Sequence, residues 1–309
     1  MRRAALGFAA YEAWSLLPPP TEAAFRRPNT AVIAQSMKKG AGMTGNDLRV
    51  RLQEEAERKL SWKMDWEKTC DQFLAGDPGA EVKGIAVAWL STQKIIEQAQ
   101  ERGANLLVTH EPLYTLQPDA AKGIGADHPW VRKQRWLEKS GMIVYRCHDF
   151  WDDFPEIGIH GAWAKWLGFG KKPVAIRRYY EVHETGGLTL EELARRALEK
   201  TKALGQTTVG LVGDPARKTS RIALGTGAIT QYPVMTGMGA DVLLLTDDGT
   251  RLWESAQWAS DSGVSLLLVN HATAEEPGMR TLAAYLADLL KPLPVFHLPV
   301  GCLYHSVNA

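Results

Sequence analysis

The chain has 309 residues, of which 45% are hydrophobic and 23% are charged, a composition typical of a globular protein with one large or two ordinary domains. Its formal net charge of +1 excludes a general attraction to nucleic acid or anionic lipid, so we expect no nucleic-acid partner. The cysteines Cys70, Cys147 and Cys302 have no CxxC spacing, which argues against a disulfide framework or a thiolate zinc site.

Residues 1–43 mix Pro, Gly, Arg and Lys irregularly and are interpreted as an N-terminal extension. One interpretation is a disordered leader or a start codon placed too far upstream. The other, because Arg2 and Arg3 precede an alanine-rich run, is an export signal of the twin-arginine type. That run is too short to span a bilayer, and no other segment is apolar enough to do so. We therefore expect no membrane partner and a cytoplasmic location, with export as the alternative.

From Thr44 onward, hydrophobic periodicity predicts an alternation of helices and strands. Leu48, Leu52 and Leu60 recur at helical spacing, and Gly103 and Gly141 mark the ends of two later helices. The predicted helices are 44–60, 92–102, 130–140 and 159–167, and the predicted strands are 82–90, 106–109 and 143–147.

The second half repeats this alternation. Thr189 is a candidate N-cap for a helix that begins there. The predicted strands are 179–182, 207–212, 221–224, 242–245 and 264–269; helices follow at 251–260 and 280–290, and 294–303 is extended. Strands that alternate with helices predict an α/β protein with largely parallel sheets.

Three polar clusters directly follow predicted strands. In open α/β sheets, ligands bind beyond the carboxyl ends of the strands, so these clusters can meet in one crevice. The first is His110-Glu111, after the strand 106–109. Histidine with carboxylate is typical of a hydrolytic or redox metal site. The alternative is a strand-end histidine with a solvated glutamate.

The second cluster, His148 to Asp153, follows the strand 143–147. We choose Asp152 as the metal ligand, and His148 is expected to orient a ligand or a water. Asp149 and Asp153 are interpreted as turn or cap residues. The alternative is an acidic turn without a metal.

The third cluster places His271 and Glu275 four residues apart, after the strand 264–269. If this segment opens a helix, both side chains lie on one face. The alternative is a loop histidine beside a glutamate that stabilises a helix N-terminus. Nearby, Gly225-Thr226-Gly227-Ala228 is either a structural turn or a close approach to a phosphate or to the metal crevice.

With these clusters in order, the chain resembles the NIF-three-like family of dinuclear-metal proteins, often labelled GTP cyclohydrolase I type two. Thr109-His110-Glu111-Pro112-Leu113 stands where the family has His-His-Pro-Leu after a strand. His148 to Asp152 matches His-Thr-x-x-Asp, and His271 to Glu275 matches His-x-x-x-Glu. The family departures include Glu111 in place of the second histidine, and Asp247-Asp248 where Thr-Gly-Asp is followed by a histidine.

The resemblance implies a two-lobed α/β subunit with mixed, largely parallel sheets flanked by helices and a metal site in the cleft between the lobes. The dinuclear metal domain would be 44–309, with lobes at 44–168 and 169–309. It also implies homo-oligomers, namely ring-like hexamers. The implied metal ligands are His110, Glu111, Asp152, His271 and Glu275.

Two histidines with three carboxylates favour iron or manganese, and zinc also fits; we expect two divalent ions per subunit. Such a pair would activate a bridging water. The predicted function is therefore that of a metal-dependent hydrolase acting on a nucleotide-like or other small-molecule substrate, with Glu111 or Glu275 as general base. The alternative is a non-enzymatic metal carrier or an oligomeric interaction scaffold.

Overall fold

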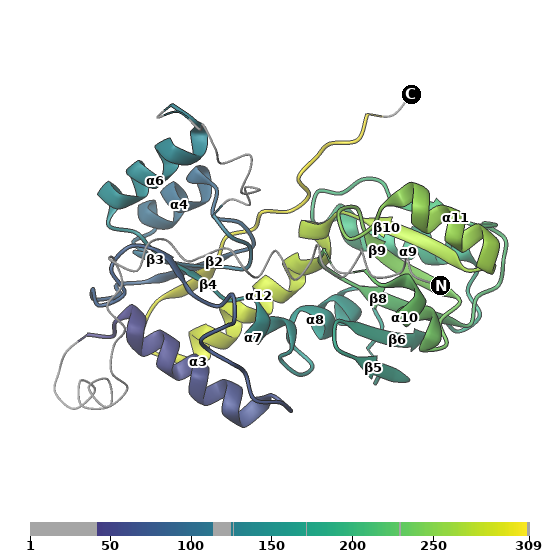
Figure 1. Cartoon of the computed structure of the whole chain (residues 1–309), viewed down its shortest axis with the longest axis horizontal. Coiled ribbons are helices and arrows are strands. Elements are labelled where there is room, and N and C mark those ends of the chain that lie inside the picture. Colours follow the sequence, from purple (N-terminus) through teal and green to yellow (C-terminus); the bar gives the residue numbers. More distant parts are fainter. Residues whose placement is uncertain (1–41, 114–124, 126, 171, 229, 308–309) are drawn as a thin grey trace, which may run out of the picture. The chain divides into compact units, whose positions relative to one another are not determined.

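The computed structural model describes residues 42–113, 125, 127–170, 172–228 and 230–307. It confirms the predicted α/β class, with two mixed sheets flanked by helices (Figure 1). The expected N-terminal extension lies outside the described residues, except for its last two. Among the described helices, none has both the length and the apolar character required to cross a bilayer.

The chain forms two compact units. The first unit takes the described residues up to Ile85 together with Ser91–Asp149, and the second takes Ala86–Leu90 together with the described residues from Phe150 onward. The chain therefore passes from one unit to the other three times. The division into lobes at 168/169, expected from the family resemblance, stays a prediction.

The first sheet has the strand order β1-β4-β3-β2-β11. Its central pair, β3 (Leu106–Thr109) and β4 (Ile143–Arg146), is parallel, and β1 (Phe73–Ala75) pairs antiparallel with β4. All four residues of β3 are buried, as expected for a parallel strand covered on both faces. The remaining strands of this sheet are β2 (Ile85–Ala88) and β11 (Val295–His297).

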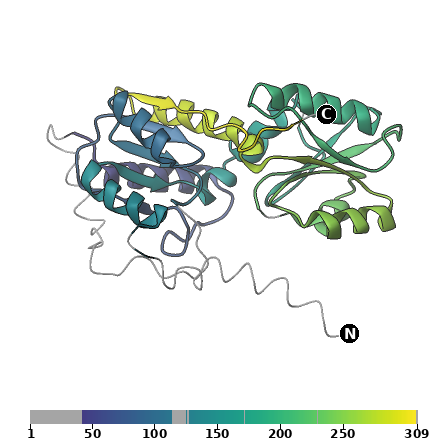
Figure 2. The ribbon, with the colours of Figure 1, turned by 90° about the horizontal axis from the view of Figure 1, so that it is seen from above.

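In the first unit, helices cover both faces of the β3–β4 pair. The helices α4 (Gln93–Glu101) and α6 (Pro129–Ser140) lie on one side, and α3 (Gly45–Lys59) lies on the other (Figures 1 and 2). A capping box fixes the start of α3: Thr44 Oγ1 accepts a hydrogen bond from the backbone N–H of Asp47, whose carboxylate accepts one from the backbone N–H of Thr44.

The second sheet has the order β5-β6-β8-β9-β10-β7. Its centre is parallel and its edges are antiparallel. The central strands are β8 (Arg221–Gly225), β9 (Val242–Thr246) and β10 (Ser265–Val269). The outer strands are β5 (Ala175–Arg177), β6 (Tyr180–Glu184) and β7 (Gly210–Val212).

Two hydrophobic cores sandwich this second sheet, because side chains alternate between faces along each strand. Leu244 of β9 packs in a core with the helices α8 (Ile159–Trp166) and α9 (Leu190–Lys202). Its neighbours Leu243 and Leu245 pack in a second core on the other face. That second core includes Met235 of α10 (Tyr232–Gly237) and Ala259 of α11 (Leu252–Ser262). The predicted cap at Thr189 is confirmed, again as a capping box.

The helix α12 (His271–Leu289) begins nine residues earlier than the sequence predicts. Asn270 alone separates it from β10, and Pro277 and Gly278 lie inside the helix rather than in a loop. A side chain at Gly278 would place its Cβ 2.5 Å from Cδ1 and 2.9 Å from Cα of Ile159. This glycine therefore serves the close packing of α12 against α8 and does not mark a helix boundary.

Candidate metal centre

In the first unit, the predicted residues His110 and Glu111 come together with His148. The parallel register pairs Thr109 with Arg146, so the segments beyond β3 and β4 leave the sheet at the same edge. The rings of His110 and His148 stack with their centroids 4.3 Å apart and their planes 15° apart. One ligand-type atom from each of His110, Glu111 and His148 lies within 4.8 Å of the others. These three residues are called the first ligand group.

The hydrogen bonds of His110 favour a metal-binding tautomer. Its side chain is fully buried, and its Nδ1 lies 3.2 Å from the backbone oxygen of Cys147. Since a carbonyl oxygen can only accept, the Nδ1 atom carries the proton, and in the neutral ring Nε2 then has the lone pair. Arg146 donates from Nε to the backbone oxygen of His110 at 2.9 Å, and its guanidinium lies 3.5 Å from Glu111 Oε2. Both candidate ligands are thus held in place by β4.

In the second unit, the predicted residues Asp152, His271 and Glu275 form a second ligand group. His271 and Glu275 lie one turn apart on α12, with His271 Nε2 3.0 Å from Glu275 Oε1. Asp152 ends the short helix α7 (Asp149–Asp152), and one of its oxygens lies within 4.8 Å of a Glu275 oxygen. All three side chains are at least nine-tenths buried.

The contact between His271 and Glu275 is one that a cation would stabilise. Asp248 Oδ2 lies 2.9 Å from His271 Nδ1, and a carboxylate at that position favours a proton on Nδ1. The lone pair of Nε2 then faces a carboxylate oxygen of Glu275 at 3.0 Å. Two acceptor atoms at this distance repel unless a proton or a metal ion lies between them. The donor set of this group therefore fits a divalent ion.

Two residues that the sequence reasoning did not select hold this second group. Asp247 Oδ1 accepts the backbone N–H of His271 at 3.0 Å, and this carboxylate stabilises the N-terminus of α12. Trp89 donates from Nε1 to Glu275 Oε2 at 2.7 Å, and its ring meets the His271 ring edge-on at 5.0 Å. Asp247 and Asp248 follow β9, the parallel neighbour of β10, so their strand-end position was the signal available in the sequence.

The turn at Gly225-Thr226-Gly227 lies close to the second ligand group. This agrees with the interpretation of the sequence in which the turn approaches the metal site. Gly227 has a φ of +67°, and a Cβ there would lie 3.0 Å from Glu275 Oε1 and 3.5 Å from His271 Nε2. Thr226 Oγ1 lies 3.2 Å from Nδ1 of His160. His305, by contrast, is exposed near the C-terminus.

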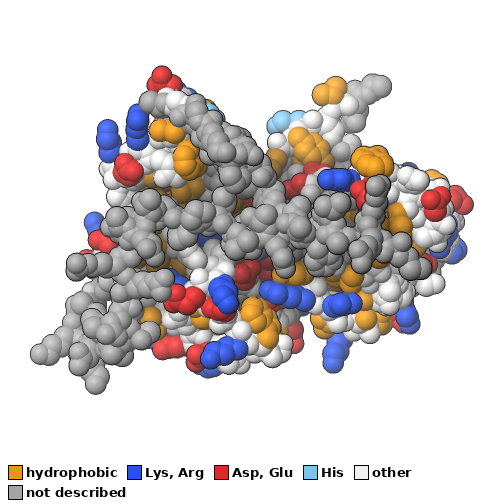
Figure 3. All heavy atoms as spheres, in the orientation of Figure 1, with side chains coloured by type: hydrophobic (Ala, Val, Ile, Leu, Met, Phe, Trp, Pro, Cys, Tyr) orange, Lys and Arg blue, Asp and Glu red, His pale blue; other side chains and the backbone are white. Residues whose placement is uncertain are grey.

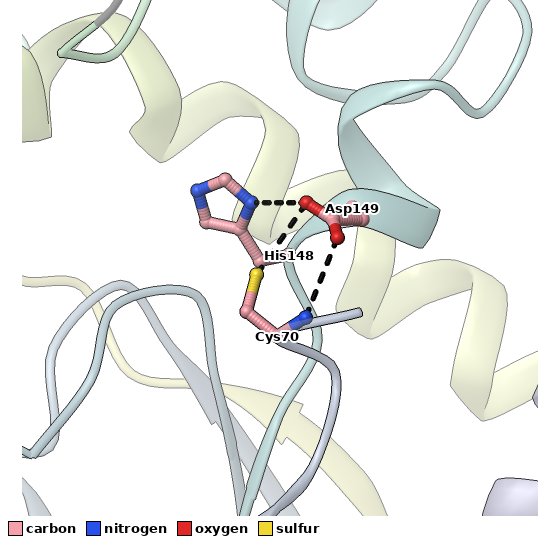
Figure 4. Close-up of side chains that lie close together, drawn as sticks. All are labelled: Cys70, His148 and Asp149. Atoms are coloured by element: carbon pink, nitrogen blue, oxygen red, sulfur yellow. Dashed lines mark hydrogen bonds and ion pairs between the residues drawn. The ribbon is translucent and has the colours of Figure 1, made fainter. Parts of the chain in front are cut away.

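A third arrangement surrounds Asp149, which was interpreted as a turn or cap residue. Its Oδ1 lies 3.2 Å from His148 Nδ1 and 3.4 Å from the thiol of Cys70 (Figure 4). Its Oδ2 accepts a hydrogen bond from Thr69 Oγ1 at 2.8 Å. Burial opposes the carboxylate charge, but the bonds from His148, Thr69 and Cys70 outweigh it and hold the pKa of Asp149 well below its usual value. Asp149 is therefore a charged anchor for His148.

Similar proteins with curated names are labelled GTP cyclohydrolase 1 type 2 homolog. The protein from Clostridium perfringens is 27% identical over 211 residues, which cover 66% of this chain and 78% of that protein. The protein from Streptomyces coelicolor is 28% identical over 250 residues, which cover 76% of this chain and 81% of that protein.

Solved structures share the fold. A hypothetical protein of Staphylococcus aureus is 20% identical with a TM-score of 0.68, and the match covers 86% of this chain and all of that one. A Bacillus cereus protein related to NIF3 is 13% identical with a TM-score of 0.68, and the match covers 87% of this chain and all of that one. At these identities the likeness concerns the fold alone.

The resemblance inferred from the sequence motifs is confirmed at the level of the family. Residues 43–300 match the family described as Duf34/NIF3 (NGG1p interacting factor 3). Since this match spans both ligand groups and most of the described residues, the chain belongs to the Duf34/NIF3 family.

Proposed function

We propose that this protein is a dinuclear-metal-dependent hydrolase that binds divalent ions through histidine and carboxylate side chains of the two ligand groups. The observation that carries the proposal is the buried His271–Glu275 contact, where the ring nitrogen Nε2 lies 3.0 Å from a carboxylate oxygen and Asp248 lies 2.9 Å from the other ring nitrogen. His110 supports it, because its Nδ1 is held by a backbone carbonyl and its Nε2 is left as the ligand atom. The ligands would be His110, Glu111, Asp152, His271 and Glu275.

The donor set favours hard or borderline ions. Imidazole nitrogen and carboxylate oxygen suit iron, manganese and zinc. When bound, such a pair supplies a water of lowered pKa that can attack a phosphoryl or amidine-like carbon centre. The protein's own residues fix the imidazoles through Asp248 and Cys147 and exclude solvent from the buried ligands.

Glu111 is our choice for the general base. Both oxygens of Glu275 lie within 3.0 Å of ring nitrogen atoms, those of Trp89 and His271. We therefore propose Glu275 as a ligand rather than as the base. Glu111 is half-buried, and its charge is supported by Arg146 at 3.5 Å. A carboxylate within reach of the attacking water can accept its proton.

The substrate class is a nucleotide-like or other small molecule. The curated relatives carry the name GTP cyclohydrolase 1 type 2 homolog, which supports a nucleotide-like ring system. Acidic and basic side chains are interspersed on the visible face of the described residues (Figure 3), in keeping with the net charge of +1. We also propose a cytoplasmic homo-oligomer, a hexamer by family resemblance.

The test compares wild type with His271→Ala and Glu111→Gln, purified without chelators. His305→Ala is the matched control, because His305 is an exposed histidine outside both groups. Metal content is measured by mass spectrometry, and turnover is measured on phosphoesters, GTP and cyclic amides. We expect wild type and the control to hold two ions per chain and to turn over one substrate class, and His271→Ala to lose both properties.

The Glu111→Gln variant separates two roles for this residue. If Glu111 is the general base, the variant should retain its metal while turnover falls by about 10²-fold or more. If Glu111 is a metal ligand, both metal content and turnover should fall. Fewer than one tightly bound ion per wild-type chain would overturn the dinuclear proposal. Metal exchange without turnover on any substrate would favour the alternative, a carrier, for which Glu111 in place of the family histidine is the supporting observation.

A further inference from the structure

Cys70, His148 and Asp149 form a cluster that the proposed function does not use as ligands. They lie in the first unit, and one ligand-type atom from each lies within 4.8 Å of the others. Sulfur, nitrogen and oxygen donors converge there, and Figure 4 shows Cys70 and the Nδ1 edge of His148 directed toward the same oxygen of Asp149. We propose that these three residues bind a separate thiophilic divalent cation of the zinc class.

The spacing of the donor atoms fits a tetrahedral ion. Asp149 Oδ1 lies 3.4 Å from Cys70 Sγ and 3.2 Å from His148 Nδ1. Around tetrahedral zinc, with bonds of about 2.3 Å to sulfur and about 2.0 Å to nitrogen or oxygen, neighbouring donors lie about 3.3–3.5 Å apart. Both separations match this range, and a bound ion would replace the thiol and imidazole protons, which pass to solvent.

The surrounding bonds hold the cluster in this geometry. The fully buried Asp71 accepts the backbone N–H groups of His148 and Asp149 through one oxygen, at 2.8 Å and 2.7 Å. Thr69 Oγ1 and the backbone N–H of Cys70 donate to Asp149 Oδ2. Because Oδ2 is engaged in this way, Oδ1 is the oxygen presented to Cys70 and His148.

This site is distinct from the first ligand group, although the two share His148. Its Nδ1 faces Asp149, whereas Nε2 points away from Cys70 and Asp149 in Figure 4. Three protein ligands leave a fourth position of a tetrahedral ion for water or another molecule. Thiolate in the donor set selects zinc-class ions over magnesium or calcium.

The test is a titration of Co²⁺, a spectroscopic probe for zinc sites, into the full chain after chelation. We expect a thiolate-to-cobalt charge-transfer band in wild type. The band should be lost in Cys70→Ser, along with one equivalent of ion, and zinc affinity should fall at least tenfold. The control is Cys302→Ser, since Cys302 is also a partly buried free cysteine but lies in the second unit.

The His271→Ala variant keeps this inference separate from the proposed function. A band that survives in His271→Ala supports the thiolate site even if the dinuclear proposal fails. Absence of the band in wild type, or its persistence in Cys70→Ser, would overturn the inference.

If Cys70→Ser fails to fold, which circular dichroism would reveal, the wild-type thiol provides the second measurement. Alkylation of Cys70, followed by peptide mass spectrometry, should slow at least tenfold when zinc is added. An alkylation rate that does not respond to zinc would count decisively against the site.

Discussion

At the scale of single residues, the second ligand group depends on groups that bind no metal themselves. Asp248 sets the tautomer of His271, Asp247 fixes its backbone, and Trp89 fixes one oxygen of Glu275. Gly227 belongs to the same set, because its lack of a side chain leaves room beside the Nε2–Oε1 contact. Residues around such ligands commonly contribute about 10–100-fold to metal affinity.

We predict that Gly227→Ala weakens metal binding by about 10-fold to 100-fold, because an inserted methyl group in a packed site costs about 1–3 kcal/mol. Its Cβ would lie 3.0 Å from Glu275 Oε1. The matched control is Gly263→Ala: Gly263 has almost the same φ, +68° against +67°, but a Cβ there meets no described atom within 4 Å. Metal affinity measured by competition with a chelator should fall in the first variant only; equal affinities would contradict the prediction.

The sequence predicts the ligand types but not the residues that orient them. His110, His271 and Glu275 follow apolar runs, so their position at strand ends is readable. Asp248 also follows a strand, but it lies 23 residues from its partner His271, and Cys70 lies 79 residues from Asp149. No local pattern indicates which residue each of them contacts. Cys70 was set aside as a ligand because it lacks a CxxC partner, whereas in the folded chain it lies close to His148 and Asp149.

At the scale of elements, α12 carries the largest share of the second ligand group. Its start at His271 places two ligands on one face in the first two turns. Gly278 then lets the helix lie against α8, where Ile159 fills the space that a side chain would need. The packing of α12 against α8 thus fixes the position of the helix that carries His271 and Glu275.

We predict that Gly278→Ala destabilises the protein by about 1–3 kcal/mol, since its Cβ would lie 2.5 Å from Ile159 Cδ1. The control is Gly237→Ala in α10, where an added Cβ would have no described atom within 4 Å. This substitution should be neutral or slightly stabilising. Free energies of unfolding come from urea denaturation. Because the clash is with Ile159, the double variant Gly278→Ala/Ile159→Ala should recover part of the loss; a fully additive double variant would argue against this contact.

Strongly patterned elements are predictable from the sequence, whereas two of the short edge strands were not. The strand 106–109 was predicted with its observed bounds, because its four apolar or β-branched residues end at a polar cluster. The three-residue edge strands β1 and β5 were missed, since neither contains a fully buried residue. The start of α12 was missed because Pro277-Gly278 resembles a loop, whereas close packing against Ile159 explains the glycine.

At the scale of the whole molecule, bound ions would contribute to folding free energy. If the ligand residues hold divalent ions, the native state binds ions that the unfolded chain binds weakly. We predict that removing metal with a chelator lowers the melting temperature of wild type, because ligand at about 100 times its dissociation constant stabilises by about 2.7 kcal/mol. His271→Ala should melt at a lower temperature and respond much less to the chelator. A wild-type melting temperature that chelation does not change would argue against metal-linked stability.

The fold class was predictable because the alternation of strands and helices is readable in the sequence, and solved structures that are only 13–20% identical share this fold. Oligomeric state and substrate are not encoded in local patterns in the same way. They depend on the molecular surface and on the loops that follow the strands. In this chain the departures from the family motifs, at Glu111, Asp247 and Asp248, lie in such loops.

The five residues Ala86–Leu90 belong to the second unit although both flanking segments belong to the first. They include Trp89, whose indole donates to Glu275 nearly two hundred residues later. A gene split near residue 150 would therefore not yield two self-sufficient halves: the C-terminal product would lack this tryptophan, and the N-terminal product would carry it without its carboxylate. Replacing one half by a domain of another protein would separate Trp89 from Glu275 in the same way. This connectivity therefore favours inheritance of both units together.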